Sequence, residues 1–197
     1  MKDGMDRAAW IVGFALLALV AAPAGAADCN QAGNELSNCD FTNHVGDWTL
    51  VTGDMLIHEP ADGATAPGCL EVSGYFNNTT YDVWVVSDCL PVTGGGTYQS
   101  GFSVKRQTGQ AGVECFAQVT YYTGVTCSSF LSNEVTPGIV IDSIWQEIFE
   151  THVAPATAES AAFLMICGHS SDYEVRFDDA LYGQGLVPAE LISFTVE

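Results

Sequence analysis

The stretch Val175-Arg176-Phe177-Asp178-Asp179-Ala180-Leu181-Tyr182 alternates apolar and polar residues like a β-strand and carries two adjacent carboxylates. It has a counterpart near the other end of the chain, where Asn38-Cys39-Asp40-Phe41-Thr42 leads into Gly46-Asp47-Trp48. Between the two motifs, short alternating runs are separated by Gly, Pro, Asn and Asp, which is the pattern of an all-β chain. The motifs therefore bracket a β domain.

The alternating runs predict a two-sheet antiparallel β-sandwich, and the length after residue 27 suits one domain over residues 28–197. Trp48 and Trp145 are both predicted to lie in its core. The predicted strands are Trp48 to Val51, Met55 to His58, Cys69 to Gly74, Tyr81 to Ser87, Thr97 to Arg106, Val113 to Tyr122, Gly138 to Val153, Ala161 to Cys167, Glu174 to Tyr182 and Leu191 to Val196.

Residues 1–27 have the features of an export signal. Lys2 and Arg7 precede an apolar run from Trp10 to Ala22, and small residues follow it up to Ala27. The run is short of the about 20 residues that a membrane-spanning helix needs. We therefore expect a secreted protein, periplasmic or extracellular, without membrane insertion.

The chain is strongly acidic, with a formal net charge of −19. After the predicted signal, Lys105, Arg106 and Arg176 are the only strongly basic residues. Such a surface repels nucleic acid and anionic lipid, and it suits neutral ligands or cations such as calcium. Solubility outside the cell explains the charge equally well.

All seven cysteines follow the predicted signal, so an oxidising compartment would form at most three disulfides and leave one thiol. Cys29 is expected to pair with Cys39, because the segment between them is polar and turn-like. Cys89 is expected to pair with Cys127, because each lies at the edge of a predicted strand. The remaining connectivity is open, and no cysteine or histidine spacing suggests zinc.

The two bracketing motifs resemble those of carbohydrate-binding modules with a galactose-binding-like jelly roll, which are often attached to secreted glycoside hydrolases. The resemblance extends to Cys89-Leu90-Pro91-Val92 before Gly96-Thr97-Tyr98, and to Val153-Ala154-Pro155-Ala156-Thr157-Ala158. Together these pieces cover most of Asn38 to Tyr182. The resemblance implies a jelly-roll fold and a binding function without catalysis.

The same resemblance implies a structural calcium ion where the N-terminal motif meets the last strand. Asp40, Asp178 and Asp179 occupy the matching places and offer the hard oxygen ligands that calcium prefers. Thr42 departs from the family, which commonly has an acidic residue after the phenylalanine. Alternatively, the two adjacent aspartates cap a turn or lie in solvent.

A sugar-binding face is predicted on the strand Val113 to Tyr122. A period of two places Cys115, Ala117, Val119 and Tyr121 on the core side, and Phe116, Gln118, Thr120 and Tyr122 on the other. Aromatic rings beside an amide and hydroxyls suit a neutral oligosaccharide or polysaccharide. Trp84, on another strand, would extend this face, and the predicted site is Trp84, Phe116, Gln118 and Tyr122. Alternatively, these aromatic residues are buried under loops.

The sequence does not predict an enzyme. His169-Ser170-Ser171-Asp172 contains the residue types of a hydrolase triad, but they are adjacent within one predicted turn, and no Gly-x-Ser-x-Gly is present. The favoured hypothesis is a secreted glycan-binding module without catalytic activity. The alternative is a surface β-sandwich that contacts other proteins, which an exposed or covered aromatic face would discriminate.

Overall fold

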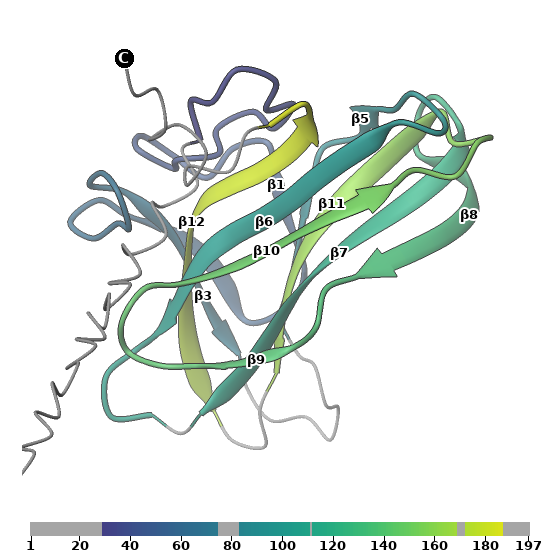
Figure 1. The fold of residues 1–197 in the computed structure, drawn as a ribbon. Helices are drawn as coiled ribbons and strands as arrows, with labels where there is room; N and C mark the ends of the chain where they lie inside the picture. The colour runs from purple at the N-terminus through teal and green to yellow at the C-terminus, as the bar shows by residue number, and fades with distance from the viewer. Residues whose placement is uncertain (1–28, 75–82, 111, 169–171, 187–197) are drawn as a thin grey trace, which may run out of the picture.

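Two antiparallel sheets face each other in the computed structural model, which describes residues 29–74, 83–110, 112–168 and 172–186 (Figure 1). The predicted two-sheet β-sandwich is therefore confirmed. No helix in these described ranges is long and apolar enough to cross a membrane. The predicted signal, the start of the strand predicted from Tyr81 and the strand predicted at Leu191 to Val196 lie outside the described residues.

The first sheet has seven strands, in the order β1-β4-β11-β7-β8, with β5 beside β11 and β9 beside β7. Its strands are β1 (Trp48–Thr52), β4 (Val83–Ser87), β5 (Leu90–Pro91), β7 (Val113–Gly124), β8 (Ser128–Val135), β9 (Ile139–Ile141) and β11 (Ser160–Gly168).

The second sheet has five strands, in the order β10-β6-β12-β3-β2. Its strands are β2 (Met55–Glu59), β3 (Cys69–Gly74), β6 (Thr97–Arg106), β10 (Gln146–Val153) and β12 (Tyr173–Gln184).

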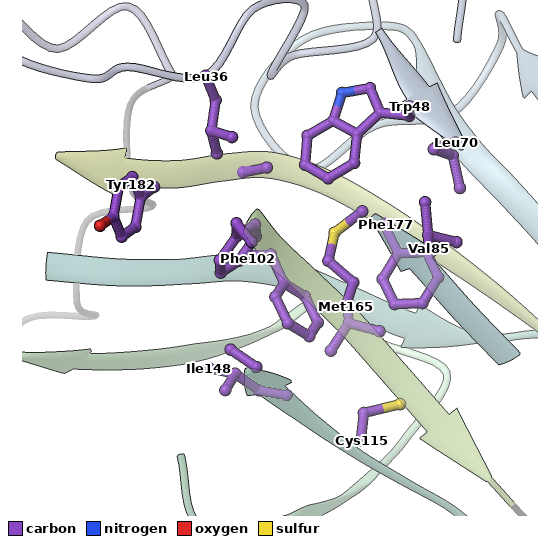
Figure 2. Close-up of a cluster of buried hydrophobic side chains, with 14 of the residues drawn as sticks. Leu36, Trp48, Leu70, Val85, Phe102, Cys115, Ile148, Met165, Phe177 and Tyr182 are labelled. Atoms are coloured by element: carbon purple, nitrogen blue, oxygen red, sulfur yellow. The ribbon is translucent and has the colours of Figure 1, made fainter. Parts of the chain in front are cut away.

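The core lies between the two sheets and follows the alternation of the sequence. On β6, Tyr98, Phe102 and Val104 are buried, as the pattern predicts, and on β7 the set from Cys115 to Tyr121 is buried. Figure 2 shows Phe102, Met165 and Phe177 packed in this layer. Because successive side chains of a strand point to opposite faces, the other set on β7 lies on the outer face of the first sheet.

The two bracketing motifs lie side by side. The Ala180 amide donates to the Cys39 carbonyl, and the Asn34 side chain donates to the carbonyls of Cys29 and Ala180. Trp48 is buried as predicted, and its indole N–H donates to the Asn38 carbonyl. The N-terminal segment is therefore fixed against β12.

Three disulfides are present, and they include both predicted pairs, Cys29–Cys39 and Cys89–Cys127. The third joins Cys115 to Cys167 within the core. Cys69, which is fully buried on β3, is the free cysteine.

The structure differs from the prediction in its strands and in one core residue. Strands β5 and β8 were not predicted, and the strand predicted from Gly138 to Val153 is two strands, β9 and β10, separated by residues 142–145. Trp145 lies in that connection and not in the core: the Lys105 ammonium lies 4.7 Å from the centre of its ring. The neighbouring Ile144 is 68% exposed, so this apolar pair does not point inward.

Candidate functional site

The outer face of the seven-stranded sheet brings the predicted sugar-binding residues together. Ile166 on β11 lies opposite Trp84 on β4 and opposite Phe116 on β7, so these three side chains form one row across three strands. In the next row, Leu164 lies between Val86 and Gln118. Residues directly opposite in neighbouring strands have side chains on the same face.

Strand β8 extends these rows with residues that the sequence analysis missed. Val135 lies opposite Gln118, Asn133 opposite Thr120, and Phe130 opposite Tyr122. The Gln118 amide donates to the Thr120 hydroxyl over 3.1 Å. These three rows of β7 and β8 therefore combine two aromatic rings with two amide side chains, and Phe116 adds a third ring on β7.

The centre and the β8 side of this face differ in exposure. Leu164 and Ile166 are buried, with Ile166 only 1% exposed, and they pack with Trp84 and Phe116. On β8, Phe130 is 65% exposed. The accessible part of the predicted face is therefore its β7–β8 side, while Trp84 and Phe116 cover an apolar cluster at the centre.

Trp84 is half-buried, and its indole nitrogen is buried without a hydrogen-bond partner among the described residues. Phe116, Gln118 and Tyr122 are also half-buried. These four residues share one face, as the alternation predicts, but Trp84 lies on its more enclosed side.

The rows from Phe116 to Tyr122 are uncharged although the chain carries a net charge of −19, and Glu114, the outward residue before Phe116 on β7, lies just beyond them. On β4, β11, β7 and β8 these rows contain apolar, aromatic, amide and hydroxyl side chains and no Asp, Glu, Lys or Arg. These residues are Trp84, Val86, Phe116, Gln118, Thr120, Tyr122, Phe130, Asn133, Val135, Ala162, Leu164 and Ile166.

The end of the β7–β8 hairpin is held in place by β11 and a disulfide. The Ser160 hydroxyl donates to the Gly124 carbonyl and accepts from the Cys127 amide. Cys127 is bonded to Cys89 and packs against the apolar cluster at the centre of the face. These contacts fix the turn that places Phe130 beside Tyr122.

Phe130 and Asn133 were missed because Ser128 to Val135 is rich in polar residues and lacks strict apolar alternation. A turn at Gly124 to Cys127, directly after a predicted strand, was the available signal for a hairpin. The exposed edge position of β8 explains the weak pattern, because an edge strand needs few apolar side chains.

The three predicted calcium ligands lie at the junction of the N-terminal segment and β12. Asp178 and Asp179 are 1% and 3% exposed, and Asp179 adopts a positive φ of 46° where β12 is irregular. The Asp178 carboxylate accepts hydrogen bonds from the amides of Ala64 and Asp179, and the Thr65 hydroxyl donates to Asp179. The two aspartates therefore hold the loop before β3.

Asp40 is engaged differently. Its carboxylate accepts hydrogen bonds from the amide and hydroxyl of Thr42, the residue that replaces the acid typical of the resembled family. Its charge still acts on Asp178, since burial, with the charges of Asp179 and Asp40, raises the pKa of Asp178 to about 7. Asp178 forms no ion pair with any residue in the described ranges.

The described residues include no group of three or more His, Cys, Asp or Glu side chains placed to hold a metal ion. A cation here would therefore need peptide or hydroxyl oxygens besides the carboxylates. Calcium accepts such mixed oxygen ligands.

No protein-family model matches this sequence, and a search of curated proteins finds no match. The solved structures with a similar fold are mostly carbohydrate-binding modules.

One similar structure contains the CBM22-1 and GH10 modules of Clostridium thermocellum endo-1,4-β-D-xylanase 10B, complexed with xylohexaose. It is 21% identical with a TM-score of 0.59, over 78% of this chain and 29% of that one. The chain likewise spans only 21% and 27% of a phage tailspike and an arabinofuranosidase.

Isolated modules are matched over nearly their whole length. The CBM22-1 xylan-binding domain of Paenibacillus barcinonensis Xyn10C is 13% identical with a TM-score of 0.58, over 80% of this chain and 98% of that one. TmCBM61, solved with β-1,4-galactotriose, is 13% identical with a TM-score of 0.55. The match covers 77% of this chain and 98% of TmCBM61. These similarities show that the chain has the β-sandwich fold of carbohydrate-binding modules.

Proposed function

We propose that this protein is a glycan-binding module without catalytic activity, which binds a neutral oligosaccharide or polysaccharide on the outer face of β7 and β8. The proposal rests chiefly on the uncharged rows of aromatic and amide side chains, from Phe116 to Tyr122 and across to β8, on a strongly acidic chain. Sugar rings stack on aromatic faces, and their hydroxyls pair with amides and hydroxyls.

Each side chain has a role in this proposal. Tyr122 and Phe130 provide the stacking surface, while Gln118 and Asn133 donate to and accept from sugar hydroxyls. Phe116 and Trp84 pack on the apolar cluster next to this surface and so help to hold it in place. Trp84 also offers its unpaired indole N–H to a ligand that extends this far.

Two structural neighbours were solved in complex with xylohexaose and with β-1,4-galactotriose. Both ligands are uncharged oligosaccharides, which supports the same ligand class for this chain. Three disulfides support an oxidising compartment, and we therefore propose secretion to the periplasm or the extracellular space.

We propose in addition that calcium binds beside the irregular part of β12, with Asp178 and Asp179 as ligands and Asp40 close by. Two adjacent carboxylates that are almost fully buried favour a cation, because burial of uncompensated negative charge is costly. A bound calcium ion would supply positive charge and so stabilise the junction of the N-terminal segment with β12; no catalytic role is assigned to it.

The glycan proposal is tested by affinity electrophoresis and thermal unfolding of the oxidised protein with xylan, galactan, β-glucan and mannan. A ligand that binds the folded state raises the unfolding midpoint. Tyr122→Ala and Phe130→Ala should abolish the shift or retardation, while Phe149→Ala, which changes a 39% exposed aromatic on the other sheet, should leave it unchanged. No response to any polysaccharide by the folded protein rejects glycan binding.

The second candidate is a protein-interaction role, favoured by the apolar side chains exposed along and beside the edge strand β8: Val125, Phe130 and Val135. Exposed sheet edges can pair with a strand of another chain. The same Phe130→Ala variant would then weaken protein capture without affecting any glycan.

A further inference from the structure

The Cys89–Cys127 disulfide joins two segments that lie on opposite sides of β11. Cys89 directly precedes β5, and Cys127 lies in the turn between β7 and β8, while β5 and β7 both pair with β11. Cys127 and Tyr122 pack against the same apolar cluster at the centre of the outer face. The disulfide therefore borders the proposed glycan-binding surface.

The end of the β7–β8 hairpin that carries Phe130 is paired over a short length. β8 is an edge strand of the described sheet, and its register with β7 shifts just before Tyr122. Two residue pairs follow this shift, Tyr122 with Phe130 and Gly124 with Ser128. The Ser160 hydroxyl adds two hydrogen bonds to the turn. The disulfide is the covalent anchor of this hairpin end.

The same hairpin end contains unfavourable backbone conformations. Cys127 and Ser129 have positive φ angles of 52° and 64°. Residues with a Cβ atom rarely adopt such angles, and they keep them only where the surrounding structure enforces them. Cys127 is held by its disulfide, so opening the bond allows this turn to relax. The relaxed turn would no longer fix Phe130 beside Tyr122.

A reductant in solution can reach this disulfide in the folded protein. Cys89 is exposed and Cys127 is half-buried, whereas the cysteines of the other two disulfides are all buried. Thiol–disulfide exchange requires that a thiolate reach one of the two sulfur atoms. Reduction at Cys89–Cys127 can therefore occur while the core disulfide Cys115–Cys167 stays intact.

We propose that the Cys89–Cys127 disulfide is a redox-sensitive switch of the glycan-binding face: its reduction releases the end of the β7–β8 hairpin and weakens glycan binding. This inference rests on the glycan-binding function proposed above.

The reductant in this step is a dithiol. One of its thiolates attacks the exposed Cys89 sulfur, the S–S bond breaks, and Cys127 leaves as a thiolate that takes up a proton. The second thiol of the reagent then displaces Cys89 from the mixed disulfide. The protein gains two electrons and two thiols, and the dithiol is oxidised to a disulfide.

Hydrogen exchange measured by mass spectrometry tests the structural step without a glycan. After limiting reduction with dithiothreitol, peptides from residues 123–135 should exchange faster, while peptides from β6 and β12 should keep the rates of the oxidised protein. Unchanged exchange over residues 123–135, once Cys89 and Cys127 are reduced, overturns the proposal. So does faster exchange throughout both sheets, which would mean general unfolding.

Glycan binding is measured by affinity electrophoresis of the oxidised and reduced forms in xylan, galactan, β-glucan and mannan. The reduced form should show a dissociation constant about tenfold higher, the effect of losing roughly one aromatic contact, and reoxidation with glutathione disulfide should restore binding. Equal retardation of the two forms rejects the redox control alone. If none of the four polysaccharides retards the oxidised protein, the glycan function is rejected and its redox control with it.

Serine variants separate the effect of the bond from that of the reagent. Cys89→Ser/Cys127→Ser should bind as weakly as the reduced protein and should not respond to dithiothreitol. Cys29→Ser/Cys39→Ser removes a disulfide of the N-terminal segment and should keep both normal binding and the response. Thermal unfolding verifies that both variants are folded. Normal binding by the first variant, or an equal loss in both, contradicts the proposal.

Discussion

Cys115 and Cys167 lie directly opposite each other on the inner faces of β7 and β11, and a disulfide joins them. Both are fully buried. The bond therefore links, at the core, the two central strands whose outer faces carry Phe116 and Ile166. The disulfide that stabilises the core therefore also holds together the two strands that carry part of the proposed glycan-binding face.

Replacing this pair with Cys115→Ala/Cys167→Ala should lower the free energy of unfolding by about 2–4 kcal/mol, because the unfolded chain loses a cross-link over 52 residues. Denaturant unfolding measures the change. The matched variant Cys29→Ala/Cys39→Ala removes a cross-link over only 10 residues and should lower the free energy of unfolding by less. Equal costs would contradict the chain-entropy argument.

The Cys89–Cys127 disulfide should be the first to open under limiting reductant. Cys89 is exposed, whereas the cysteines of the other two disulfides are all buried. Alkylation with an isotopic label, followed by peptide mass spectrometry, should show Cys89 and Cys127 modified before the other four. Earlier modification of Cys115 or Cys167 would contradict the prediction.

Cys69 should resist alkylation in the folded, oxidised protein. It is 0% exposed, and burial raises the pKa of its thiol to about 12, so little reactive thiolate forms. Unfolding should make it the single cysteine that reacts without reductant. Rapid labelling of the native protein at pH 8 would show that β3 opens.

The variant Asp178→Asn distinguishes a calcium-binding role of Asp178 from a purely structural one. In chelator, the folded pKa near 7 exceeds the ordinary 3.8, so the folded state binds more protons and stability falls as pH rises from about 4 to 7. The variant should lose this part of the pH dependence and be more stable than the unchanged protein at pH 8.

Calcium at pH 8 should raise the unfolding midpoint of the unchanged protein but not of Asp178→Asn. Magnesium serves as the control cation, since it fits mixed oxygen sites of this kind less readily. If calcium shifts neither protein, or shifts both equally, Asp178 is not a calcium ligand and its role is to hold the loop before β3.

His152→Phe should remove a loss of stability at acid pH. Burial lowers the pKa of His152 below the ordinary 6.5, so the unfolded chain binds the proton more readily as pH falls below that value. The folded state is then disfavoured, and stability decreases with acidification. Denaturant midpoints from pH 7.5 to 5 should decrease more steeply for the unchanged protein than for the variant; parallel curves would contradict this assignment.

Local alternation in the sequence was enough to predict which side chains face inward on β6 and β7, because successive residues of a strand point to opposite faces. It therefore placed Phe116, Gln118 and Tyr122 on one outer face before any partner strand was known. The polar segment between Cys29 and Cys39 and the strand-edge positions of Cys89 and Cys127 likewise predicted two disulfides that the structure contains.

The order of strands in the sheets was decided only by the tertiary structure, since hydrogen bonding between distant segments leaves no local pattern. Placing β11 between β4 and β7 buries Ile166 between Trp84 and Phe116, and it brings Cys167 to Cys115. Pairing β8 with β7 sets Phe130 beside Tyr122, although the weak alternation of this edge strand concealed it. Alternation along each strand therefore predicts which residues share a face, and long-range strand pairing determines which of those residues become neighbours.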